Sequence, residues 1–359
     1  MVEPSDMYDL VKTLTEIPGP TGQEDLVQAW CARHWSILAA VVQVSPVGNV
    51  LARVGGAGPR IIVLGHGDEL ALVVRSITAE GLLTVWPAWR DVRGRPPYWY
   101  SPINQPVCVL ADDGLIDGQL CYASGHVVGG PRDKDTFEWD DWFVDLGLRD
   151  RARVDALGIH PGTRLVPNPP TRRLGDAVVG KAMDNRAALA IATAVGERAR
   201  AETLRYELWI GSSVQEENGL LGAASVAATE RFDYGIALDV GLCGDVPGTN
   251  PARHPSRLGD GPIVVHSDTF AHYSPRVSRA LVETARAAGL PVQQAVFQNY
   301  GSDGAELIRH GVETGLIAFP TRYTHSPNEM VTLEDLERTV DLILAFLERE
   351  PLSPRWDGR

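Results

Sequence analysis

The chain has 359 residues, of which 44% are hydrophobic, and this is enough for one large domain and a smaller one. Its formal net charge of −13 excludes the basic surface with which proteins bind nucleic acid, so we predict no nucleic-acid partner. No apolar run approaches the roughly 18 residues that a membrane span requires, so we predict no membrane partner either.

Helical and strand patterns alternate in the first part of the chain and again in its last part. The helical patterns cover residues 8–17, 24–35, 186–198, 277–288 and 333–348, and the short apolar strands cover 50–54, 61–64, 206–210 and 234–238. Between Ala71 and Thr163, short strand patterns are separated by turn residues, without a long helical period. We therefore predict an α/β domain formed by residues 1–70 and 164–359, with a small β-rich domain inserted at residues 71–163.

Imidazole and carboxylate side chains follow three of the predicted strands. The strands and the residues that follow them are 61–64 with His66, 206–210 with Glu216 and Glu217, and 234–238 with Asp239. Ligands of open α/β sheets gather at the carboxyl ends of the strands. We therefore expect His66, Glu217 and Asp239 to meet at one edge of the sheet.

Two further segments supply side chains of the same kind, with Asp184 at the start of a helical pattern and His325 in a late loop. Zinc and cobalt are bound well by imidazole and carboxylate, and two ions about 3.5–4 Å apart need a bridging carboxylate. We expect Asp184 to be that bridge. His66 and Asp239 would then complete the ligands of one ion. Glu217 and His325 would complete those of the other.

The two remaining acidic residues of these segments have different expected roles. Glu216 stands beside Glu217, and one of two adjacent carboxylates can bind a metal while the other transfers a proton. We predict that Glu216 is the catalytic base, which accepts the proton of a water molecule and passes it to the leaving amine. Asp68 lies two residues after His66, so both side chains point the same way from a strand. We expect Asp68 to support catalysis by orienting the imidazole, without binding metal itself.

Each of these residues taken alone has an ordinary structural role. A histidine near a strand is usually a core or surface residue, a pair of glutamates is usually solvated, and an aspartate before a helix is usually its N-cap. The metal hypothesis rests on five such segments that share one pattern. The other histidines lack this context, and we assign them structural roles: His34, His126, His160, His254, His266, His272 and His310.

Taken together, these segments resemble the glutamyl aminopeptidase or tetrahedral (TET) aminopeptidase family of metallopeptidases, which includes deblocking aminopeptidases and proteins labelled endoglucanase. The similarity runs from Leu14–Glu24 to Gly315–Phe346 and is densest in Pro320–Glu329. The resemblance implies a mixed-sheet, three-layer metallopeptidase domain with two divalent ions per subunit, zinc being favoured over cobalt or manganese. The metal ligands and base that it implies agree with the residues above: His66, Asp184, Glu217, Asp239 and His325 as ligands, and Glu216 as the base.

The resemblance also implies an aminopeptidase that removes amino-terminal residues from peptide substrates and self-associates into a hollow dodecamer. One departure is Asn185, which stands where many members have a second acidic residue. Another is the aromatic-rich region Val73–Arg132, which matches the family poorly. We expect several of its aromatic side chains to be exposed, at a subunit interface or in a substrate pocket: Trp86, Trp89, Tyr98 and Trp99.

Other functions fit parts of this pattern. The same metal scaffold would serve an N-acyl amino acid deacylase or a carboxypeptidase. A glycosidase needs a pair of carboxylates but no metal. A metal-binding shell protein without catalysis is a further alternative, although a second glutamate beside Glu217 argues against it.

The amino terminus and the cysteines bear on the cellular location. Met1–Asp6 is acidic and lacks the apolar region of a secretion signal. The cysteines show no close-pair spacing typical of a metal site, so we expect reduced thiols: Cys31, Cys108, Cys121 and Cys243. Both features predict a cytoplasmic protein.

Overall fold

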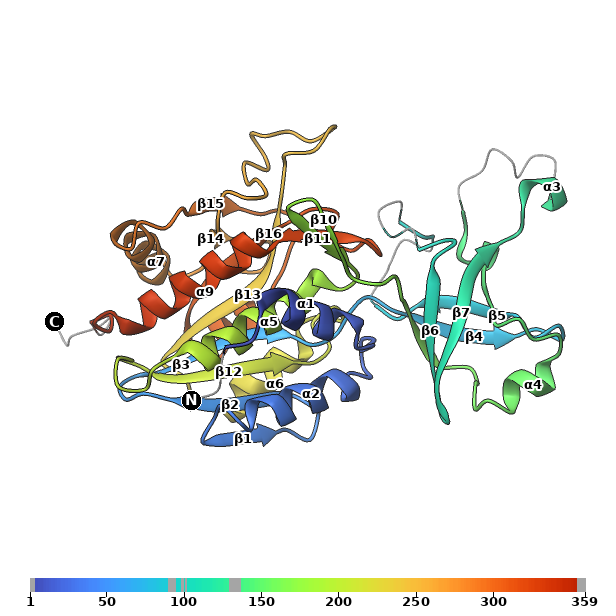
Figure 1. Cartoon of the computed structure of the whole chain (residues 1–359), viewed down its shortest axis with the longest axis horizontal. Coiled ribbons are helices and arrows are strands. Elements are labelled where there is room, and N and C mark those ends of the chain that lie inside the picture. Colours follow the sequence, from blue (N-terminus) through green and yellow to red (C-terminus); the bar gives the residue numbers. More distant parts are fainter. Residues whose placement is uncertain (1–3, 90–94, 98–99, 101, 129–136, 354–359) are drawn as a thin grey trace.

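The computed structural model describes residues 4–89, 95–97, 100, 102–128 and 137–353. The chain forms an α/β body and a small barrel that lie side by side (Figure 1). They are joined by the segments that follow strands β3 (Arg60–His66) and β9 (Arg164–Pro167). No helix in the described part of the chain combines the length and the apolar character needed to cross a bilayer.

The α/β body is built on an eight-stranded mixed sheet in the order β1-β2-β12-β3-β13-β16-β14-β15. Its four central strands, from β12 to β16, run parallel, and β2 and β14 flank them in the opposite direction. The further bounds are β1 Val41–Val44, β2 Val50–Gly55, β12 Glu207–Ser213, β13 Tyr234–Leu242, β14 Ile263–Ser267, β15 Gln293–Val296 and β16 Glu313–Thr321.

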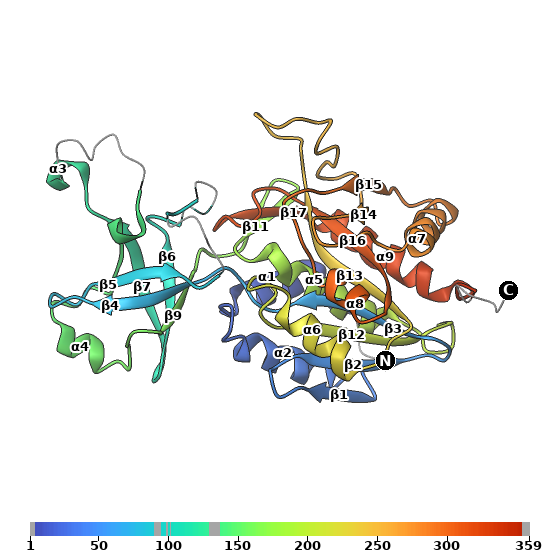
Figure 2. The same cartoon turned by 180° about the vertical axis from the view of Figure 1, so that it is seen from behind.

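Helices cover both faces of this sheet. Because side chains alternate along a strand, Ile61 and Val63 of β3 enter the core on one face, and Ile62 and Leu64 enter the core on the other. The first face carries α1 Met7–Glu16, α2 Asp25–Trp35, α5 Met183–Arg198, α7 Pro275–Ala287 and α9 Leu333–Glu348 (Figure 1). The second face carries α6 Leu221–Thr229 and α8 Gly304–Arg309, which Figure 2 shows in front of the sheet.

Local sequence explains why α9 starts and packs as it does. The hydroxyl of Thr332 accepts a hydrogen bond from the backbone N–H of Asp335 at 3.1 Å, which caps the helix. Buried apolar residues then recur at helical spacing, at Leu336, Val340 and Ile343. The predicted helix at 333–348 has the bounds of α9, and the other predicted helices end within a few residues of those observed.

The inserted region forms a closed antiparallel barrel in the strand order β4-β5-β8-β7-β6-β9. Strand β9 pairs with both β4 and β6 and so closes the barrel. The barrel therefore continues to Pro167, past the predicted domain boundary at residue 163, because closure needs this last strand. Its other bounds are β4 Leu72–Ile77, β5 Leu83–Pro87, β6 Pro106–Ala111, β7 Gly114–Tyr122 and β8 Trp142–Asp145, with the short helices α3 Gly125–Val128 and α4 Arg151–Asp155. The mixed α/β fold with a small β-rich insert is confirmed.

The prediction that Trp89 is exposed is wrong. Its side chain is buried at 8% exposure, and its ring meets those of Tyr100 and Trp139 edge-on at centroid distances of 4.6 and 5.9 Å. The reason is that Trp89 packs into the apolar core of the inserted domain, to which the barrel strands contribute aliphatic residues such as Leu72 and Val85. Trp86 is partly exposed at 38%. The other two aromatics of that prediction, Tyr98 and Trp99, lie outside the described residues.

A separate three-stranded antiparallel sheet lies beside the start of α5. It contains β10 Arg172–Leu174, β11 Ala177–Gly180 and β17 Glu329–Thr332. Gly180 of β11 stands opposite Glu329 of β17. This pairing brings the segment that leads into α5 next to the segment that follows β16.

Candidate metal centre

Three of the predicted site segments meet at the carboxyl ends of neighbouring parallel strands. His66 is the last residue of β3 and lies opposite Ser213, the last residue of β12. Glu216 and Glu217 follow β12 in the chain, and Asp239 lies in β13 on the other side of β3. The parallel strands that the apolar patterns predicted are confirmed, and together they deliver four polar side chains to one edge.

The start of α5 brings Asp184 to the same edge. Asp184 and Asn185 have non-helical backbone angles, so regular helix begins at Arg186. Close packing of α5 on the sheet depends on Gly65, because a Cβ atom there would lie 2.8 Å from the Cβ of Ala188. Asp184 therefore lies beside His66 because a small residue on each element lets the helix approach β3.

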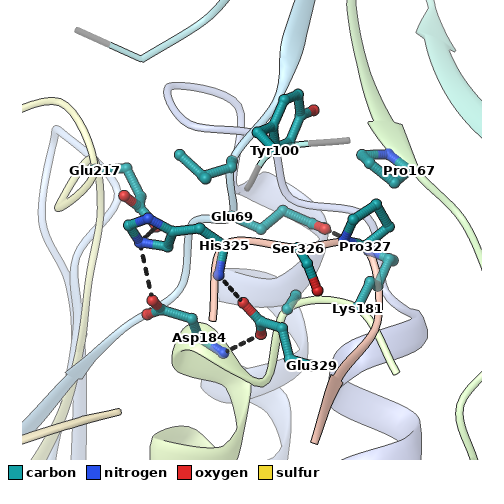
Figure 3. Close-up of a pocket in the computed structure, with 12 residues that line it drawn as sticks. Glu69, Tyr100, Pro167, Lys181, Asp184, Glu217, His325, Ser326, Pro327 and Glu329 are labelled. Atoms are coloured by element: carbon teal, nitrogen blue, oxygen red, sulfur yellow. Dashed lines mark hydrogen bonds and ion pairs between the residues drawn. The ribbon is translucent and has the colours of Figure 1, made fainter. Parts of the chain in front are cut away.

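The carboxylate of Asp184 lies between two imidazoles. Its Oδ1 is 3.2 Å from Nε2 of His66, and its Oδ2 is 3.2 Å from Nε2 of His325. Oδ2 also accepts a hydrogen bond from the hydroxyl of Thr324 at 3.0 Å. Glu217 completes the second side, with its Oε1 3.6 Å from Nε2 of His325 (Figure 3). Each oxygen of one carboxylate thus faces a different group of donors, which is the geometry of a bridge.

Three groups of side chains have donor atoms within 4.8 Å of one another and could hold a metal ion, among the residues that the structure describes. They are His66 with Asp184 and Asp239, Asp184 with Glu217 and His325, and His66 with Glu216 and Glu217. The first two share Asp184. All five predicted ligands and the predicted base are therefore brought together, whereas these groups contain none of the other histidines.

Asp68 lies behind His66 and not among these donors. Its Oδ1 is 3.3 Å from Nδ1 of His66, whose Nε2 faces the other carboxylates. The two oxygens of Asp68 also accept hydrogen bonds from the backbone N–H groups of Glu216 at 2.9 Å and Glu217 at 3.1 Å. Asp68 thus contacts the imidazole, as predicted, and it also holds the peptide groups of the two glutamates, which the sequence pattern did not indicate.

Burial and mutual repulsion dominate the electrostatics of the cluster. Burial raises the pKa of Glu217 to about 7, although the charge of His325 opposes this rise. Burial also raises the pKa values of Glu216 and Asp239 well above their ordinary range. For Asp184, burial acts in the same direction, but hydrogen bonds with the two imidazoles outweigh it and lower the pKa. Buried carboxylates this close repel each other, and a cation between them relieves the repulsion.

The donor set fits divalent metal ions of the zinc type. Imidazole nitrogens and carboxylate oxygens are suitable ligands for zinc, cobalt and manganese. The Oε1 atom of Glu217 is buried without a hydrogen-bond partner, although it lies among the donors of the second group. A buried carboxylate oxygen without a hydrogen bond is costly in a folded protein, and coordination of an ion satisfies it.

Two residues of the site were not assigned by the sequence pattern. Thr324 donates its hydroxyl to the carboxylate of Asp184, and the carboxylate of Glu329 accepts hydrogen bonds from the backbone N–H groups of Asp184 and His325 (Figure 3). The only available signal was their position within the segment Pro320–Glu329, where the family resemblance is densest. Spacing alone does not distinguish them from surface residues.

Asn185, the departure from the family pattern, is fully buried beneath the site. Its side-chain amide donates a hydrogen bond to the backbone oxygen of Leu238 at 2.8 Å. An aspartate lacks this donor. In this chain Asn185 therefore ties α5 to β13, next to Asp239.

A cavity of about 490 Å³ opens beside the cluster. Its lining includes Asp184, Glu216 and Glu217, together with apolar and aromatic residues and an ion pair. In that ion pair, Oε1 of Glu306 is 2.8 Å from Nη1 of Arg309. The lining residues outside the candidate ligands include Leu220, Leu242, Phe270, Asn299, Tyr300, Glu306 and Arg309. A cavity of this size holds a large amino-acid side chain next to the candidate metal centre.

Comparisons with known proteins agree on one family. The sequence model of the M42 glutamyl aminopeptidase family matches residues 48–342. The TET aminopeptidase from the marine sediment archaeon Thaumarchaeota archaeon SCGC AB-539-E09 is 28% identical, with a TM-score of 0.89 over 96% of this chain and 97% of that one. The Pyrococcus horikoshii TET1 peptidase, described as able to assemble into a tetrahedron or a large octahedral shell, is 26% identical, with a TM-score of 0.85 over 95% and 99%. A lysyl aminopeptidase of Pyrococcus furiosus is 28% identical over 95% of this chain and 96% of its own.

Proposed function

This chain belongs to the M42 glutamyl aminopeptidase family and is therefore a peptide hydrolase of a metal-dependent family; on that premise we propose that it removes amino-terminal residues from peptides with two bound divalent ions. One observation carries the proposal. The two oxygens of Asp184 each lie 3.2 Å from a different histidine, so that one carboxylate serves two adjacent groups of ligands.

The proposed ligands divide between the two ions as the donor groups do. His66 and Asp239 would hold the first ion and Glu217 and His325 the second, and Asp184 would contribute one oxygen to each. When bound, two such ions lower the pKa of a water molecule towards about 7 and polarise the scissile carbonyl. We favour zinc, with cobalt and manganese as the alternatives that the same donors accept.

The side chains of the chain itself move the proton and orient the ligands. Glu216 accepts the proton of the water molecule and passes it to the leaving amine. Its place beside Glu217 and in the lining of the cavity supports this role. Asp68 orients the imidazole of His66 and holds the peptide groups of Glu216 and Glu217. The cavity beside Glu216 and Glu217 accommodates the first side chain of the peptide.

The nature of the substrate is tested by a pair of matched peptides. Purified protein with added zinc, cobalt or manganese should release the first residue of a peptide with a free amino terminus, and a chelator should abolish this release. Preferred hydrolysis of the amino-terminally acetylated peptide would support the deacylase alternative, and release from the carboxyl end would support a carboxypeptidase. Binding of two ions without hydrolysis of any peptide would support the shell protein.

The proposed bridging role of Asp184 is tested by measuring how much metal a variant binds. Asp184→Ala should lose both ions, or keep at most one that is weakly held, because the bridge belongs to both groups of ligands. Elemental analysis of the dialysed variant measures this directly. Two tightly held ions in Asp184→Ala would contradict the proposal that Asp184 bridges them.

We also propose that the chain self-associates. The support is its similarity to the TET1 peptidase, which is described as able to assemble into a tetrahedron or a large octahedral shell. Light scattering of the purified protein should give a mass well above that of one chain, and a single-chain mass would end this part of the proposal. The dodecamer and the cytoplasmic location stay predictions.

A further inference from the structure

Glu329 is the buried carboxylate that joins the two segments on either side of the second group of ligands. It is the first residue of β17, and only 2% of it is exposed. Its Oε2 accepts the backbone N–H of Asp184 at 2.8 Å, and its Oε1 accepts the backbone N–H of His325 at 2.6 Å (Figure 3). One side chain thus holds the peptide groups of the bridge and of a histidine that lies 141 residues further along the chain than the bridge.

The backbone of Glu329 is itself held in place on two sides. It pairs with Gly180 in the antiparallel ladder between β11 and β17, and Asp184 follows Gly180 in the chain after Lys181, Ala182 and Met183. The next residue, Met330, exchanges backbone hydrogen bonds with Arg322 at 2.9 and 3.0 Å, which closes the loop that carries His325. The carboxylate therefore starts from a fixed point between the two segments.

The two N–H groups that Glu329 accepts belong to irregular backbone. Asp184 has ψ of 99°, outside the helical range, and His325 has a positive φ of 66°. Neither conformation continues a helix or a strand that would supply a backbone acceptor. A buried N–H without an acceptor is costly, so the carboxylate stabilises the conformations in which Asp184 and His325 face one another.

We propose that Glu329 is a positioning residue that sets the separation of Asp184 and His325, and thereby the affinity of the second ion. This rests on the proposed ligand assignment. The first ion keeps His66 and Asp239, which stand on strands β3 and β13 and are held by the sheet. The second ion depends on His325, whose loop is tied to the bridge through Glu329. Loss of the Glu329 carboxylate therefore lowers the affinity for the second ion more than the affinity for the first.

The substitution Glu329→Gln tests this with little change in shape. A carboxylate accepts at both oxygens, whereas an amide accepts at one and presents a donor at the other, so one of the two backbone N–H groups loses its acceptor. Titration of metal-free protein with zinc should show one ion bound as in the wild type and a second bound about 10–100-fold more weakly. At saturating zinc, kcat should return towards the wild-type value, because the reacting groups are unchanged.

Glu197→Gln is the matched control. The Glu197 side chain is also buried and accepts hydrogen bonds, from the backbone N–H of Ser5 at 2.8 Å and the hydroxyl of Ser5 at 2.7 Å, but it stands at the opposite end of α5 from Asp184. This variant should bind both ions as the wild type does. Thermal unfolding of the metal-free proteins shows whether each variant is folded before the titration.

The outcomes separate the two proposals. Wild-type protein that binds fewer than two ions contradicts the proposed function itself. With two ions in the wild type, unchanged affinity for both in Glu329→Gln overturns the positioning role, and so does an equal loss of both. If Glu329→Gln does not fold, Glu329→Asp keeps the charge but shortens the reach by one methylene, and the same selective loss of the second ion is expected; wild-type affinity at both sites in that variant overturns the role.

Discussion

The α/β body and the barrel fill their interiors with different side chains. The core of the body is largely aliphatic, with the alanine-rich helix α5 packed closely on β3. The core of the barrel contains a cluster of aromatic rings. The ring centroids of Trp142 and Trp139 are 5.2 Å apart, and those of Tyr100 and Trp89 are 4.6 Å apart. Small side chains let a helix approach a sheet, whereas in the inserted domain large rigid rings pack beside the aliphatic side chains of the strands.

The two regions also differ in role, because the α/β body carries the candidate ligands and the barrel supports it. All the candidate ligands stand on the α/β body, where strand ends and the start of α5 converge. The barrel supplies Tyr100 to the wall of a pocket that also contains Glu217 and His325 (Figure 3). We therefore expect changes at the strand ends to alter catalysis or metal binding with little effect on folding. We expect changes in the barrel core to alter stability with little effect on the metal ions.

The largest expected effect is that of Glu216→Gln. Loss of a general base should lower turnover by roughly 10²–10⁴-fold while the fold and the two ions stay in place. Steady-state kinetics together with elemental analysis test both halves of this expectation. Turnover close to that of the wild type would exclude Glu216 from proton transfer.

A substitution in the barrel core should have the opposite result, with lower stability but unchanged metal binding. Trp142 is 2% exposed, so Trp142→Ala should lower the free energy of unfolding by about 3–5 kcal/mol through lost burial and a cavity. The half-exposed Trp86 is the control, and Trp86→Ala should cost about 1 kcal/mol or less. Denaturant titration measures both. Equal losses in the two variants, or loss of metal from folded Trp142→Ala, would contradict the separation.

Asp68→Ala should have a smaller effect on the site than loss of the base. Asp68 contacts His66 and the peptide groups of two glutamates without belonging to the donor groups, so metal affinity or activity should fall by about 10–100-fold. Metal titration and kinetics on the same preparation measure it. Complete loss of both ions would place Asp68 among the ligands.

The smallest expected effect is a pH dependence of stability in the α/β body. Burial, followed by repulsion from Asp68, raises the pKa of Glu24 from 4.5 to about 7. The folded protein therefore holds this proton more tightly than the unfolded chain, so stability present below pH 4.5 is lost as the pH rises to about 7. Glu24→Gln keeps an acceptor for the N–H groups of Gly22 and Gln215 but cannot ionise.

Metal-free Glu24→Gln should therefore be more stable than the wild type by about 1–2 kcal/mol above pH 7. The difference in stability should vanish below pH 4.5, where Glu24 of the wild type is neutral, as its glutamine replacement is at every pH. Denaturant titrations at several pH values measure it. A difference that grows as the pH falls would show that the sign is wrong.

The amino-acid sequence by itself determined the longer helices, the strands that end at the candidate site, and most of the site residues. An apolar strand followed by His66, Glu217 or Asp239 is a local pattern, and parallel strands must bring such ends to the same edge. The place of Asp184 could also be predicted, because an acidic residue at the start of a helix has a fixed position relative to that helix. These inferences succeed because each depends on a few consecutive residues.

Only the tertiary structure decided the features that depend on contacts between distant segments. Trp89 is buried because its ring packs on Tyr100 and Trp139, which come from other segments of the inserted domain. Strand β9 belongs to the barrel because it pairs with both β4 and β6. Glu329 acquires its place between Asp184 and His325 from the pairing of β11 with β17. Periodicity predicts which face of an element is apolar, but the partner of a buried carboxylate or ring is set by packing between elements.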